Sequence, residues 1–125
     1  WVVFDKDDYS DEQFDKAIKT CDYNVAWSNP NFELWLLSHF KKVSRYISKD
    51  NVLQELSREF QKKDLGDYTK NDTNIFEKVT SEERLHTAIK NCEYMEELNK
   101  DEQASQRNPM TKVYKIIDGL KEYLE

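Results

Sequence analysis

A cluster of aspartates follows the apolar segment at the start of the sequence. Trp1 to Phe4 are apolar, and Asp5 and Asp7 come directly afterwards. In an extended segment, residues two apart point to the same side, so these two carboxylates are expected to lie together. Adjacent carboxylates repel each other, and a hard cation such as Mg²⁺ or Mn²⁺ relieves that repulsion. The spacing predicts a divalent-metal site, although a solvated acidic turn leading into a helix would have the same sequence.

Glu33 is an acidic residue within the otherwise apolar segment from Phe32 to Phe40. If this segment is a helix after a second parallel strand, its start lies at the sheet edge where open α/β sheets bind ligands. Glu33 would there bind the metal or orient its water; stabilisation of the positive helix end explains it equally well. Ser28 and Asn29 are expected at the same edge as polar ligands, with helix capping as the alternative for Asn29.

Two groups of residues are candidates for binding phosphate or nucleic acid. Tyr68 and Lys70 lie in a polar, glycine-containing segment and could contact a phosphate, or they could belong to an ordinary solvated loop. Lys41, Lys42 and Arg45 follow the segment of Glu33, where cations also suit the negative end of a helix. Each group therefore has a structural explanation beside the functional one.

The histidines and cysteines do not form a recognisable site. His39 is expected to be a hydrogen-bonded core residue and His86 to lie on a solvated helix face. Cys21 and Cys92 are far apart without metal-type spacing, which favours buried free thiols in a reducing compartment. The sequence has no glycine-rich phosphate loop, Ser/His/Asp set or Cys/His zinc pattern.

The elements that would position these residues begin with a strand–helix–strand unit. Residues 1–4 and 23–28 read as buried strands, and Ser10 with Gln13 forms a capping-box signature between them. This order predicts a parallel βαβ unit. Further helix starts are predicted at three places: Asn29-Pro30, Thr80 with Glu83, and Asn108-Pro109. The sequence predicts an α/β fold with two strands and about five helices, the second half being mainly helical.

Composition limits the classes of function. The 125 residues carry a net charge of −6, so the molecule as a whole repels nucleic acid and needs a basic patch or bridging cation to approach it. No apolar run is long enough to span a bilayer, and no signal peptide is visible, which predicts a cytoplasmic protein without membrane contact. The chain opens without Met in a strand, so we expect it to be the C-terminal part of a longer protein that supplies further strands.

Three stretches together resemble a known family. They are Trp1-Val2-Val3-Phe4-Asp5-Lys6-Asp7-Asp8, Ala26-Trp27-Ser28-Asn29-Pro30-Asn31-Phe32-Glu33-Leu34-Trp35 with His39-Phe40, and Tyr68-Thr69-Lys70 with Asn108-Pro109-Met110-Thr111-Lys112-Val113. They resemble the RloB family, which includes the AbiLii-type abortive-infection proteins of bacteria and archaea. The resemblance covers most of the chain.

The resemblance implies a Toprim-like nuclease fold, which holds Mg²⁺ with an Asp-x-Asp and a glutamate on an earlier strand. Asp5 and Asp7 match the Asp-x-Asp, and Glu33 matches the Phe-Glu of the family. The earlier glutamate has no counterpart, so this fragment alone is expected to be inactive. Residues 1–45 would form the C-terminal part of the catalytic core, and residues 46–125 a helical extension packed on it in one globular unit.

The implied function is metal-dependent nucleic-acid cleavage in anti-phage defence, with a companion ATPase or a homo-oligomer as partners. Asp5, Asp7 and Glu33 would act through Mg²⁺ or Mn²⁺, and Lys70 would stabilise negative charge on the phosphate. One alternative is a phosphatase of the haloacid dehalogenase type, with Asp5 as nucleophile and Asp7 as general acid. Another is a non-catalytic interaction module for the partner ATPase.

Overall fold

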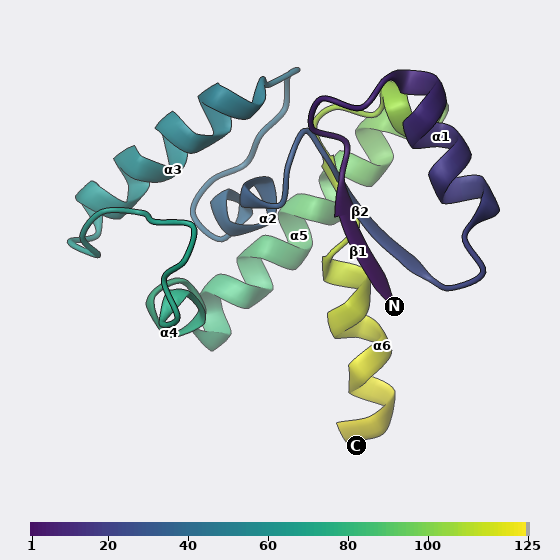
Figure 1. Cartoon of the computed structure of the whole chain (residues 1–125). Coiled ribbons are helices and arrows are strands. Elements are labelled where there is room, and N and C mark those ends of the chain that lie inside the picture. Colours follow the sequence, from purple (N-terminus) through teal and green to yellow (C-terminus); the bar gives the residue numbers. More distant parts are fainter. Residues whose placement is uncertain (125) are drawn as a thin grey trace.

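A three-stranded mixed sheet lies at the centre of the computed structural model, which describes residues 1–124 (Figure 1). β1 (Val2–Asp5) pairs in parallel with β2 (Val25–Asn29), and β3 (Met110–Thr111) pairs antiparallel on the other side of β2. The register places Asp5 opposite Ser28. The carboxyl ends of β1 and β2 therefore meet at one edge of the sheet.

The strand–helix–strand unit predicted from the sequence is confirmed. α1 (Asp11–Thr20) connects β1 to β2 and starts with the predicted capping box of Ser10 and Gln13. Its one fully buried residue, Phe14, contacts Phe4 and Trp27 edge-to-face at ring-centroid distances of 6.0 and 5.5 Å. Aromatic packing thus fixes α1 against one face of the sheet.

The helical part of the chain surrounds one short buried helix. α2 (Glu33–Ser38) is buried along its whole length and is packed between α3 (Lys49–Lys62) and α5 (Glu82–Asn99). Figure 1 shows α5 extending from α4 (Ile75–Val79) to the strands, with α6 (Tyr114–Leu124) beside the sheet. A 3₁₀ turn, η1 (Ala104–Gln106), precedes β3. One hydrophobic core contains residues from both halves of the chain.

Two predicted helix starts are wrong. Asn29 ends β2 and Pro30 lies in the following turn, while α2 begins only at Glu33 without a side-chain cap. Asn108-Pro109 leads into β3, and the last helix begins at Tyr114. Both X-Pro bonds are cis. The prediction placed Pro at the first helical position, but the preceding asparagines bond to segments elsewhere in the fold.

Three smaller predictions also need correction. The cap of α5 is Ser81 rather than Thr80, because the Ser81 side chain accepts from the Arg84 backbone N–H. Cys21 ends α1 and is only partly buried, whereas Cys92 is buried as predicted. β3 was missed because two residues are too short a run to show strand periodicity. No helix in the described part of the chain is both long and apolar enough to cross a membrane.

Candidate functional site

Asp5 is the last residue of β1 and is partly buried at the carboxyl edge of the sheet. Burial raises the pKa of its carboxyl group, because a charge is less stable away from water. A hydrogen bond from the Phe32 backbone opposes this effect, and the negative charges of Glu33 and Asp7 add to it. Asp5 and Glu33 therefore lie within electrostatic reach of each other, as the sequence predicted.

Glu33 is the first residue of α2, with only 3% of its surface exposed. The Tyr68 hydroxyl donates to its Oε1 at 3.2 Å, and Lys70 Nζ lies 3.9 Å from the same oxygen. Tyr68 and Lys70 both lie in the loop between α3 and α4. Gly66 in that loop has φ 81°, a conformation that suits glycine. Burial, followed by the charge of Glu33, raises the pKa of Tyr68, so the phenol stays a hydrogen-bond donor.

Asp7 does not continue the extended segment, so the predicted alternation of Asp5 and Asp7 is wrong. β1 ends at Asp5, and Asp7 has φ 46°, a left-handed turn conformation that Asp tolerates. Its Oδ1 lies 3.2 Å from Lys49 Nζ, and Asp8 Oδ2 lies 2.8 Å from the same nitrogen. The role of Asp7 as a metal ligand stays a prediction, although its charge still contributes to the raised pKa of Asp5.

The chemistry of the donor set fits a hydrated Mg²⁺-type ion. Mg²⁺ commonly keeps several waters and binds one or two carboxylates, which Asp5 and Glu33 could provide. After burial, the negative charges of Glu33 and Asp7 also raise the pKa of Asp5, and a cation would offset these charges. In residues 1–124, no group of three or more His, Cys, Asp or Glu side chains is arranged to hold a metal ion, so the geometry does not suit a tightly enclosed metal.

Ser28 and Asn29 do not offer free ligands at this edge. The Ser28 hydroxyl is fully buried and lies 2.8 Å from the hydroxyl of Thr111, joining β2 to β3. The Asn29 amide donates to the Ser105 carbonyl at 3.2 Å, and its oxygen accepts from the Asn108 amide at 3.4 Å. The Ser28 side chain thus holds β2 to β3, and the Asn29 side chain holds the end of β2 to the segment around η1.

The three residues of the predicted basic group line one pocket together. Lys41, Lys42 and Arg45 lie in the connection between α2 and α3, beyond the end of α2. Lys41 Nζ donates to Glu55 at 2.8 Å, and Lys42 Nζ lies 3.6 Å from the centroid of the Tyr94 ring. Arg45 is exposed. Their nucleic-acid role stays a prediction.

The two histidines are placed as expected. His39 is buried after α2, with Nδ1 2.9 Å from the Trp35 carbonyl and Nε2 without a hydrogen-bond partner in the described structure. Burial lowers the pKa of His39, so the neutral ring is favoured. His86 is exposed on α5.

Sequence reasoning missed three residues beside the site. Lys49, the first residue of α3, pairs with the aspartates after β1. Its position is a sequence signal for such a partner, because a lysine in the first turn of a helix is unfavourable beside the positive end of the helix dipole. Asn31 is buried, donates to the Lys49 carbonyl at 3.5 Å and leaves its own Oδ1 unpaired. Tyr46 is 77% exposed at the rim of a neighbouring pocket, and nothing in its spacing marked it.

The comparisons with known proteins identify a family. The model of the RloB-like protein family matches residues 1–120. No curated protein and no solved structure matches the chain. Because the match covers nearly all of the sequence, and the acidic edge of the sheet lies within it, this chain belongs to the RloB-like protein family.

Proposed function

We propose that this chain contributes the acidic edge of a metal-dependent nuclease that acts in anti-phage abortive infection. The supporting observation is the position of two carboxylates. Asp5 ends β1 and Glu33 begins α2, and the charge of Glu33 contributes to the raised pKa of Asp5. The defence role follows only from the resemblance to abortive-infection proteins.

The residues around these carboxylates suit phosphodiester chemistry. A bound Mg²⁺ or Mn²⁺ would supply charge neutralisation at the phosphate and a more acidic water. Tyr68 holds Glu33 in place by donating to Oε1, so the orientation of this carboxylate is fixed before any ligand arrives. Lys70 is 80% exposed, and its ammonium group can turn from Glu33 to a phosphate oxygen.

The first test is calorimetric titration of Mg²⁺ and Mn²⁺ into the chain and into Asp5→Asn and Glu33→Gln. Each variant removes one negative oxygen donor with little change in shape, so we expect the affinity to fall at least about tenfold. Asp22→Asn is the matched control, because this exposed aspartate lies before β2 at the opposite end of the sheet.

Equal affinity in the wild-type chain and both site variants would refute the proposed metal site. Cleavage of labelled DNA and RNA, with and without Mg²⁺, then tests the reaction. In the phosphatase alternative, a covalent phospho-aspartate forms on Asp5 after incubation with acetyl phosphate, and detecting it by mass spectrometry would favour that alternative over the nuclease. Metal binding by Asp5 without any loss of function on its substitution would favour the interaction module.

A further inference from the structure

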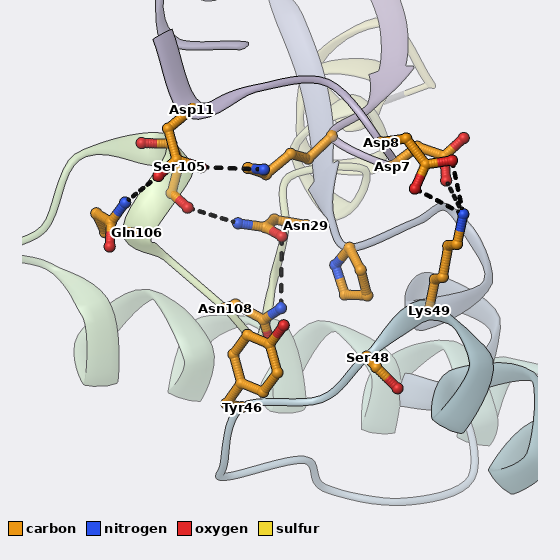
Figure 2. Close-up of a pocket in the computed structure, with 12 residues that line it drawn as sticks. Asp7, Asp8, Asp11, Asn29, Tyr46, Ser48, Lys49, Ser105, Gln106 and Asn108 are labelled. Carbon is orange, nitrogen blue, oxygen red and sulfur yellow. Dashed lines mark hydrogen bonds and ion pairs between the residues drawn. The ribbon is translucent and has the colours of Figure 1, made fainter.

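A polar pocket of about 390 Å³ adjoins the acidic edge (Figure 2). Its lining comes from the turn after β1, the turn after β2, the segment before α3 and the segment around η1. Asp7 lines this pocket two residues after Asp5, the last residue of β1, and its backbone N–H donates to the carbonyl of Pro30, another lining residue, at 2.9 Å. A ligand in the pocket would therefore lie at the same carboxyl edge of the sheet as Asp5. The volume is within the size range of small-molecule sites.

The charges of the pocket favour an uncharged group. Three aspartates and two lysines line it, which leaves a net charge of −1. Both lysines are already paired: Lys49 with Asp7 and Asp8, and Lys6 with Asp11 at 3.1 Å. A phosphate would meet carboxylates without a free cation, so the pocket does not suit a phosphate group.

Tyr46 presents an exposed aromatic ring at the rim of the pocket. Tyr46 is 77% exposed and stands beside Asn108 on one side of the pocket, while Lys49 lies on the other side (Figure 2). The Asn108 side chain accepts from the Ile47 backbone N–H at 2.9 Å and donates to the Ile47 carbonyl at 3.0 Å. These two bonds anchor the residue next to Tyr46, so the ring is presented to solvent from a fixed position.

Gln106 supplies a polar side chain to the same pocket as Tyr46. Gln106 donates through Nε2 to Asp11 at 2.8 Å, which orients its amide. A planar ligand with an aromatic face and hydrogen-bonding edges would match both features. Nucleobases have this combination, and a base can enter such a pocket only when it is unpaired.

We propose that this pocket binds one unpaired nucleobase of a single-stranded nucleic acid, with the Tyr46 ring as its stacking surface and Gln106 at its edge. The inference rests on the proposed nuclease function and names the substrate class for that site. The base occupies the pocket, and the neighbouring phosphate lies towards Asp5 and Glu33.

Fluorescence anisotropy with a labelled, phosphorothioate-protected single-stranded oligonucleotide in Mg²⁺ tests this assignment. We expect Tyr46→Ala to weaken binding about tenfold and Tyr46→Phe to retain it, because stacking requires the ring and not the hydroxyl. Tyr23→Ala is the matched control: Tyr23 is 71% exposed but precedes β2, at the far end of the sheet. Photocrosslinking of an iodouracil-containing oligonucleotide should label Tyr46.

The outcomes separate this inference from the proposed function. If the wild-type chain binds single strands but Tyr46→Ala binds equally well, the base pocket is refuted and the nuclease proposal stands. If the wild-type chain binds double-stranded but not single-stranded nucleic acid, the base pocket is likewise refuted and the nuclease proposal stands. If the chain binds neither single nor double strands, both proposals are overturned. Circular dichroism checks that Tyr46→Ala is folded, as expected for an exposed side chain.

Discussion

Lys49 holds its ammonium group between Asp7 and Asp8, the two acidic residues that follow Asp5 in the turn after β1. These hydrogen bonds raise the pKa of Lys49, the bond to Asp8 contributing most, so the lysine stays charged. An ammonium group in this position competes with a divalent cation for Asp7. The electrostatics of single residues therefore decide how much of the acidic turn a metal could use.

Replacing Lys49 with glutamine should increase the affinity for Mg²⁺. The substitution removes the competing positive charge and frees Asp7, and we expect a gain of about two- to fivefold because exposed ion pairs are weak. Calorimetric titration measures the change. Lys100→Gln is the control, since Lys100 forms a similar exposed pair with Glu97 on α5. An unchanged affinity in Lys49→Gln would show that Asp7 takes no part in cation binding.

At the scale of elements, α2 combines complete burial with polar groups at both ends. Glu33 at its start is held by Tyr68, and Ser38 near its end donates to the Leu34 carbonyl at 2.7 Å. His39 follows as the C-cap, with its ring 4.7 Å from that of Trp35. The element that positions the candidate site is therefore sensitive to the protonation of its own buried groups.

Acid should destabilise the protein partly through His39. Burial lowers its folded-state pKa below the ordinary 6.5, and the Arg84 charge acts in the same direction. As pH falls, the unfolded chain binds this proton first, so the stabilisation present above pH 6.5 is lost on acidification. We expect the free energy of unfolding to fall more steeply from about pH 7 to about pH 5 in the wild type than in His39→Gln.

Urea unfolding at a series of pH values measures this difference. Asp5, whose pKa is raised, has the opposite effect at lower pH, but it is present in both chains and cancels in the comparison. Parallel pH profiles would mean that His39 binds its proton equally well in the folded and unfolded chains, which would contradict the expectation. The comparison uses slopes, so a general loss of stability in the variant does not obscure the result.

At the scale of the whole molecule, β1 lies at one edge of the sheet. Among residues 1–124 it pairs only with β2. Val3 in this strand is 47% exposed and Trp1 beside it is 52% exposed. An exposed apolar edge strand is a template for pairing with another chain. The 125-residue chain is therefore expected to self-associate.

Light scattering over a range of concentrations should detect this association, and Val3→Lys should reduce it. A lysine on an edge strand blocks strand pairing, and the stability of the monomer should change by no more than about 0.5 kcal/mol at an exposed position. Tyr23→Lys adds the same charge away from the edge and serves as control. A monodisperse monomer at every concentration would contradict the expectation.

The sequence by itself determined the elements with a strong local signal. The capping box of Ser10 and Gln13 between two apolar segments predicted α1 between two parallel strands, because cap chemistry acts within a few residues. The position of Asp5 after an apolar strand and of Glu33 at a helix start also predicted that both lie at one sheet edge. The resemblance to the RloB family was likewise present in the sequence.

Only the tertiary structure decided which partners these residues have. Lys49 is more than forty positions from Asp7 and Asp8, and Tyr68 is 35 from Glu33, so no local pattern could predict either contact. The two Asn-Pro pairs do not start helices, because their asparagines bond to each other and to the segments around η1 and Ile47. Long-range hydrogen bonds overrode local propensity there, since buried polar groups must be satisfied wherever the fold places them.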